Sequence, residues 1–115
     1  MNSALNPQLI QHMVDAVVTA VKPERVILFG SYGRNSARPD SDVDLLVVSN
    51  EPFGPDHSRR KEAAKVWKAL AKFGIPTDVL MYSTDEVTQW QQSPNHIISR
   101  ALQEGKVLYE QSSAS

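Results

Sequence analysis

Residues 30–48 read GSYGRNSARPDSDVDLLVV. A turn-rich stretch is followed by aspartates and then by an apolar run, and this order constrains the fold of the chain. The segment opens on a glycine–serine pair and, after ten turn-rich residues, reaches Asp42 and Asp44. Side chains alternate along a strand, so the two aspartates are predicted to share one face, about 7 Å apart. Residues 45–48 are continuously apolar, which indicates a strand that is buried on both faces.

The flanking sequence alternates helical and extended patterns. Apolar spacing and breakers predict helices at residues 7–22, 31–35, 57–73, 86–91 and 94–104, with Asn6, Thr84 and Ser93 as candidate caps of the first and the last two. Short β-branched and aromatic runs predict strands at residues 25–29, 42–49, 76–82 and 106–109. This order favours an α/β (α+β) fold in which helices pack on a sheet. We find no repeat or linker, so residues 1–110 are predicted to form one domain and residues 111–115 a flexible tail.

Composition narrows the classes of function. The chain has 115 residues and a net charge of −1, so no long nucleic acid is expected as a partner. It has no cysteine, which excludes disulfides and thiolate metal sites and leaves oxygen or imidazole as metal ligands. No apolar run is long enough to span a membrane, and no signal peptide is visible. We therefore expect a cytoplasmic protein without a membrane partner.

Gly30 and Ser31 follow the predicted strand at residues 25–29 directly and suit the binding of a phosphate. Glycine lacks a Cβ, so its backbone can approach a phosphate closely. The next backbone N–H groups, at a helix start, and the Ser31 hydroxyl can donate to an anion. Arg34 in the same loop can pair with triphosphate oxygens. The alternative is a plain strand-to-helix turn with a serine cap.

Asp42 and Asp44 would repel each other and lose hydration if partly buried, and a divalent cation relieves both penalties. Mg²⁺ keeps several waters and is usually held by one or two carboxylates plus substrate phosphates. Asp78 lies in an otherwise apolar strand and is the candidate for a third carboxylate, as a metal ligand or as a proton acceptor. This role requires the strand of Asp78 to lie beside that of Asp44. The alternatives are a solvated strand start for the pair and a lysine partner or exposed edge for Asp78.

The spacing from Gly30-Ser31 through ten residues to Asp42 and Asp44, with Asp78 downstream, resembles the signature of the DNA polymerase β-like nucleotidyltransferase superfamily. Residues 30–48 look like its minimal nucleotidyltransferase branch, and the resemblance covers roughly residues 26–110. It implies a polymerase β-like fold with a small mixed sheet packed with helices.

The same resemblance implies roles for the site residues. Gly30 and Ser31 would position the triphosphate of ATP, and the three aspartates would bind Mg²⁺, with Mn²⁺ as an alternative. Asp78 would complete the metal site or act as base. The acceptor hydroxyl would attack the α-phosphorus in line, and pyrophosphate would leave.

Many short members of this branch are encoded beside a HEPN-family ribonuclease toxin. The resemblance therefore implies an antitoxin that transfers AMP from ATP to a tyrosine hydroxyl of a HEPN partner. The small size of the chain agrees, because it leaves little room for a separate acceptor-binding domain. The alternatives are transfer to a small molecule or an RNA end, and a noncatalytic module that blocks a toxin by binding it.

Several other side chains receive structural interpretations. Trp67 and Phe73 lie on the apolar stripe of a predicted helix and are expected in the core. The positive charges at residues 57–61, Arg59 among them, are expected to form a solvated face. His96 is expected to be structural or solvated, because no metal-ligand partner lies at useful spacing. Trp90 fits either a core or an interface.

Overall fold

The computed structural model describes residues 6–34, 36–38 and 41–111. Its helices are α1 (Pro7–Val21), α2 (Gly30–Gly33), α3 (Arg59–Ala71), α4 (Thr84–Trp90) and α5 (Ile97–Glu104). Its strands are β1 (Arg25–Phe29), β2 (Val43–Ser49), β3 (Thr77–Ser83) and β4 (Lys106–Glu110). The predicted order of elements is therefore confirmed, and most boundaries move by only one or two residues.

The strands form one mixed sheet in the order β3-β2-β1-β4. Strands β2 and β3 are parallel, whereas β1 is antiparallel to both β2 and β4. The parallel connection from β2 to β3 passes through α3, as parallel strands need a long crossover. This arrangement confirms the predicted α/β class with a small mixed sheet, and it places β2 in the interior of the sheet.

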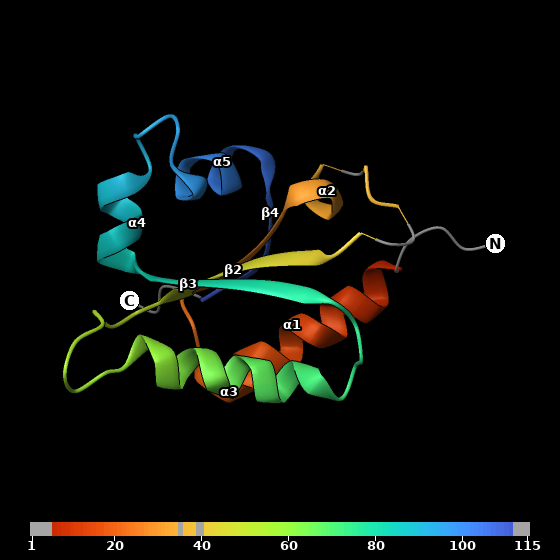
Figure 1. Cartoon of the computed structure of the whole chain (residues 1–115), viewed down its shortest axis with the longest axis horizontal. Helices are drawn as coiled ribbons and strands as arrows, with labels where there is room; N and C mark the ends of the chain where they lie inside the picture. The colour runs from red at the N-terminus through yellow and green to blue at the C-terminus, as the bar shows by residue number, and fades with distance from the viewer. Residues whose placement is uncertain (1–5, 35, 39–40, 112–115) are drawn as a thin grey trace.

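Helices cover both faces of the sheet (Figure 1). Helices α1 and α3 lie on one face, and α2, α4 and α5 lie on the other. Leu45 and Val47 join the core cluster under α1 and α3, whereas Leu46 and Val48 join the cluster under α4 and α5. All four side chains are fully buried. Burial on both faces, predicted from the unbroken apolar run, is confirmed.

The helix starts are set by specific caps. Asn6 caps α1 by accepting a hydrogen bond from the Leu9 N–H, as the sequence predicted. The predicted caps of α4 and α5, Thr84 and Ser93, are wrong. Ser83 caps α4 in a reciprocal capping box with Glu86, and His96 caps α5 through Nδ1. The structural interpretation of His96 is thereby confirmed.

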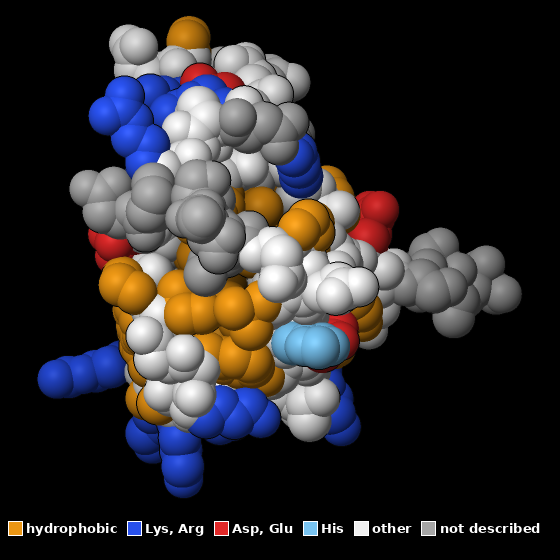
Figure 2. Space-filling model, turned by 90° about the vertical axis from the view of Figure 1, so that its right-hand side faces the viewer, with side chains coloured by type: hydrophobic (Ala, Val, Ile, Leu, Met, Phe, Trp, Pro, Cys, Tyr) orange, Lys and Arg blue, Asp and Glu red, His pale blue; other side chains and the backbone are white. Residues whose placement is uncertain are grey.

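The outer face of α3 departs from the prediction in part. Its buried stripe consists of Val66 and Leu70, while Trp67 is 46% exposed, so its assignment to the core is wrong. Trp67 points toward β3, which is an edge strand and offers no further layer to cover it. Phe73 is half-buried and does pack on the core. Lysine and arginine side chains project into solvent on the side of α1 and α3 (Figure 2).

Residues 112–115 of the predicted tail lie outside the described residues, whereas the Gln111 N–H donates to the Glu24 carbonyl at 2.7 Å. Within the described ranges, none of the helices combines the length and apolar character that crossing a bilayer requires.

Candidate active site

The register of the sheet brings two of the predicted acids together. Asp44 on β2 lies directly opposite Asp78 on the neighbouring parallel strand β3. Both side chains share the sheet face of Leu46 and Leu80, which is the face of α4 and α5. Asp42 is exposed and immediately precedes β2. The role predicted for Asp78 requires its strand to lie beside the strand of Asp44, and the structure meets this requirement.

Burial and the neighbouring carboxylates shift the pKa of Asp44. Burial raises the pKa of Asp44 above its usual value, and the negative charges of Asp78 and Asp42 raise it further. Arg34 acts in the opposite direction and lowers the same pKa. Asp44 therefore lies in a field that favours an additional positive charge beside it.

This donor set fits a hard divalent cation that keeps part of its own hydration. All three side chains offer carboxylate oxygens, which Mg²⁺ and Mn²⁺ prefer. Among the described residues, no three acidic or histidine side chains lie close enough to enclose an ion by themselves. A cation at Asp44 would therefore complete its shell with water and substrate phosphates, as Mg²⁺ commonly does.

Gly30 brings the predicted phosphate-binding turn against the acidic pair. Its φ is +67°, a left-handed conformation that glycine adopts without penalty. A Cβ at this position would overlap the Asp44 carboxylate oxygen Oδ2. Because Phe29 pairs with Asp44 across β1 and β2, the turn that follows β1 begins at this carboxylate. The two halves of the predicted site are therefore adjacent.

Ser31 and Arg34 lie in the same turn and at its end. Ser31 is half-buried in α2, and its carbonyl accepts a hydrogen bond from the Ser36 N–H at 2.8 Å. Arg34 Nη1 donates to Glu104 Oε1 on α5 at 3.0 Å, and both side chains are exposed. Arg34 is thus near the acids but already paired, so a phosphate would have to compete with Glu104 for it.

A pocket of about 340 Å³ opens beside the acidic pair. Asp44 and Asp78 contribute to its wall, and the remainder is apolar: Phe29, Trp67, Val79, Leu80 and Ile97. The sequence did not single out Trp67 or Ile97 as site residues. Both residues lie at helix positions whose spacing is typical of core residues. They line a pocket because the described sheet has no strand beyond β3 to cover them.

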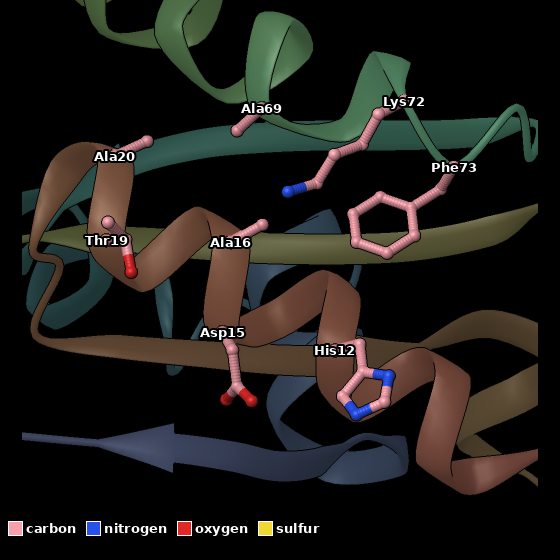
Figure 3. A pocket seen from close by; sticks show the side chains of 8 residues that line it. All are labelled: His12, Asp15, Ala16, Thr19, Ala20, Ala69, Lys72 and Phe73. Carbon is pink, nitrogen blue, oxygen red and sulfur yellow. The ribbon is translucent and has the colours of Figure 1, made fainter.

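A larger hollow of about 620 Å³ lies between α1 and α3 (Figure 3). Ala16, Ala20 and Ala69 line it together with longer side chains such as Lys72 and Phe73. It lies on the sheet face opposite Asp44 and Asp78, and no predicted site residue lines it. Size therefore does not identify the site, and we assign the site to the smaller pocket with the converging carboxylates.

The chain is similar to known proteins over most of its length. The family described as polymerase beta, nucleotidyltransferase, matches residues 11–114. A Methanocaldococcus jannaschii protein assigned as a protein adenylyltransferase is 30% identical over 89 residues, which cover 75% of this chain and 78% of that one. A second protein with the same assignment from that organism is 37% identical over 60 residues. That match covers 52% of this chain and 56% of the relative, so the chain spans little more than half of it.

A solved structure shares the fold at low sequence identity. It is the complex of a tri-AMPylated HEPN toxin with an MNT antitoxin from Shewanella oneidensis. The TM-score is 0.51 and the identity 20%, with coverage of 90% of this chain and 72% of the matched chain.

Proposed function

The chain belongs to the polymerase β nucleotidyltransferase family, and from this premise we propose that it transfers AMP from ATP to a hydroxyl group of a partner protein. The observation that carries the proposal is the position of Asp44, which lies opposite Asp78 and against the backbone of Gly30. This contact puts a carboxylate pair beside a turn whose backbone can approach phosphate.

Each residue has a distinct role in the proposed reaction. The backbone of Gly30 and the Ser31 hydroxyl hold the triphosphate, and Arg34 exchanges Glu104 for a phosphate oxygen. Asp42, Asp44 and Asp78 would hold Mg²⁺ or Mn²⁺ together with water and the phosphates of ATP, and the bound ion would supply positive charge to the phosphate oxygens.

Asp78 lies at the edge of the sheet, beside the pocket, where an acceptor can reach it. It accepts the proton of the attacking hydroxyl as the oxygen bonds to the α-phosphorus and pyrophosphate leaves. Most of the rate enhancement then comes from positioning and from charge neutralisation rather than from covalent catalysis.

The proposed partner is a HEPN toxin, and the proposed acceptor is one of its tyrosines. Support comes from the relatives assigned as protein adenylyltransferases and from the fold shared with an MNT antitoxin bound to an AMPylated HEPN toxin. On this proposal the chain acts in the cytoplasm as an antitoxin, where ATP is available.

The proposal is tested by incubating the protein with α-labelled ATP, Mg²⁺ and a purified HEPN-family protein. We expect label on a tyrosine of the partner, and none when the metal is chelated. Asp44→Asn and Asp78→Asn should each lower the rate on the order of 100-fold or more. Asp56→Asn changes an exposed loop acid and is the matched control.

Three outcomes would contradict this function. An unlabelled partner whose ribonuclease activity is still inhibited indicates a binding module. Label on a small molecule or an RNA end in place of the partner indicates a different acceptor. Equal rates for the wild type and the Asp44→Asn variant would show that the acidic pair takes no part in the reaction.

A further inference from the structure

Strand β3 forms one edge of the described sheet. The Met81 carbonyl accepts a hydrogen bond from Arg59 Nη1 at 2.8 Å, so this carbonyl faces away from β2. Backbone direction repeats every second residue along a strand, so the N–H and C=O of Val79 face the same way. The edge of β3 therefore presents backbone groups at Val79 that another extended chain can pair with.

Two pockets join along this edge. The pocket of about 340 Å³ beside Asp44 and Asp78 shares Val79 and Leu80 with a second pocket of about 500 Å³. The second pocket continues toward the start of α3 and is lined also by Arg59, Arg60, Ala63, Met81 and Tyr82. Together they form a groove, which we call the β3 groove, that leads from the acidic pair along the strand.

The acidic end of the β3 groove is flanked by two exposed apolar side chains. Trp67 comes from α3 and is 46% exposed, and Ile97 comes from α5 and is 38% exposed. The two helices lie on opposite faces of the sheet, so these side chains flank the edge of β3 from both sides. Large exposed apolar groups beside unpaired backbone are typical of a binding surface.

The far end of the groove is closed by side chains of the protein itself. Arg59 Nη1 donates a hydrogen bond to the Met81 carbonyl, and the Ser83 N–H donates to Glu86 Oε1 at 2.9 Å. Of these edge positions, the N–H and C=O of Val79, one residue beyond Asp78, and the N–H of Met81 are left for pairing. An added strand would therefore have a defined register, with one of its residues held beside the acidic pair.

We propose that the β3 groove binds an extended segment of the acceptor polypeptide, with Trp67 and Ile97 contacting the side chain that carries the acceptor hydroxyl. This inference rests on the proposed function and specifies how its acceptor is recognised. The hydroxyl oxygen bonds to the α-phosphorus of ATP, the bond to the β-phosphate oxygen breaks, and the hydroxyl proton passes to Asp78.

The lining favours a peptide over other acceptors. A polynucleotide would bring phosphates along the whole β3 groove, where the basic lining residues are Arg59 and Arg60. Arg59 is already bound to Glu86, which leaves Arg60 as the basic side chain of the groove that forms no ion pair with another described residue. A peptide backbone matches the free groups at Val79, and an aromatic or aliphatic side chain matches Trp67 and Ile97.

The test uses heptapeptides with degenerate flanks and a single central tyrosine, serine or threonine, labelled by the full chain with α-labelled ATP and Mg²⁺. We expect Trp67→Ala and Ile97→Ala to raise the KM for peptide roughly tenfold and to leave the KM for ATP unchanged. Trp67→Phe should have a KM for peptide much closer to the wild-type value than that of Trp67→Ala. Val107→Ala, an exposed apolar residue on the opposite edge strand β4, should have no effect.

Backbone methylation separates strand pairing from side-chain contact. Peptides N-methylated on alternate residues keep their side chains but lose the donors that pair with Val79, so their labelling should fall roughly tenfold in one of the two methylation frames. Equal labelling in both frames, or unchanged KM values in the Trp67 and Ile97 variants, would overturn the inference.

The remaining outcomes distinguish this inference from the proposed function. If Mg²⁺-ATP raises the Tm of the wild type but only RNA or free hydroxyl compounds are labelled, the β3 groove is not an acceptor site. The same holds if Mg²⁺-ATP binds and no peptide is labelled. If Mg²⁺-ATP neither raises the Tm nor supports any labelling, the proposed function is wrong, and the inference that depends on it is also wrong.

Discussion

Gly30 satisfies two independent constraints at the level of a single residue. Its φ of +67° is unfavourable for L residues by roughly 1–2 kcal/mol. A methyl group there would also displace the Asp44 carboxylate that lies against it. The position combines backbone strain with contact to the proposed reacting centre, so stability and activity should respond together.

Gly30→Ala should lower the rate of AMP transfer on the order of 100-fold, because the Asp44 carboxylate must move from its position. It should also lower the free energy of unfolding by roughly 1–3 kcal/mol. Single-turnover kinetics and urea titration measure the two effects. Gly54→Ala is the control, since nothing lies within 4 Å of a Cβ built there. Full activity of the Gly30 variant would contradict the assignment.

Asp44→Asn should reveal the charge crowding as a dependence of stability on pH in the absence of metal. The pKa of Asp44 is raised by burial and by Asp78 and Asp42, so the folded state binds its proton more readily than the unfolded chain. Stability of the wild type therefore falls relative to the variant as pH rises from 3.8 through the raised pKa. Chemical denaturation at pH 7 should give the wild type a free energy of unfolding about 0.5 kcal/mol below that of the variant. At pH 3.5 the two proteins should have equal free energies of unfolding. A wild type that is the more stable of the two at pH 7 would be inconsistent with this account.

At the level of elements, the junction between α3, β3 and α4 depends on Arg59. Its guanidinium forms two hydrogen bonds with Glu86, donates to the Met81 carbonyl and lies over the rings of Phe53 and Tyr82. The sequence interpretation of a solvated face holds for this side chain, which is 43% exposed, but it did not include the pairing with Glu86. The hydrogen-bond partners of Arg59 lie on β3 and α4, 22 and 27 positions further along the chain, so no local pattern revealed them.

Glu86→Gln isolates the ion pair, because glutamine can keep the capping-box hydrogen bond to the Ser83 N–H. It should lower the free energy of unfolding by about 1 kcal/mol, and Glu86→Ala by about 1 kcal/mol more. Lys65→Ala, which removes an exposed pair with Glu62, should change it by less than about 0.5 kcal/mol.

The contribution of Glu86 should also depend on pH in a defined direction. The hydrogen bond from Arg59 lowers the pKa of Glu86, so the stabilisation is complete above the ordinary value of 4.5. It fades as pH falls from 4.5 through the lowered pKa, and the difference between wild type and Glu86→Gln should shrink over that range. A difference that grows with acidification would rule out the ion pair as its source.

At the scale of the whole molecule, the two helical layers share one sheet. Strand β2 gives alternate side chains to each core cluster, so neither layer can keep its packing if β2 leaves the sheet. Trp67 lies on α3 and Trp90 on α4, on opposite faces. The chain thus carries one fluorescent probe in each layer.

Variants with one tryptophan each, Trp90→Phe and Trp67→Phe, should unfold with coincident midpoints in urea, because a shared strand makes the transition cooperative. Tryptophan fluorescence and far-UV circular dichroism measure the midpoints. Separated midpoints would show that the layers unfold independently.

Local chemistry determined much of this protein. The predicted strand at residues 25–29 matches β1 at both ends, because β-branched and aromatic residues favour extended backbone between a proline and a glycine. The run at residues 45–48 predicted two buried faces, and the spacing of Gly30, Asp42 and Asp44 predicted one site. Periodicity and residue chemistry act over neighbouring positions, so the sequence alone exposes them.

Tertiary structure decided what depends on strand order and register. Placing β3 next to β2 puts Asp78 opposite Asp44, and leaving β3 at the edge exposes Trp67, whose spacing is that of a core residue. The same packing pairs Arg59 with Glu86, although the Arg59 side chain stays 43% exposed. The pairs Asp44–Asp78 and Arg59–Glu86 join residues that are 34 and 27 positions apart, and their energies arise only when the packed strands and helices bring the partners into contact.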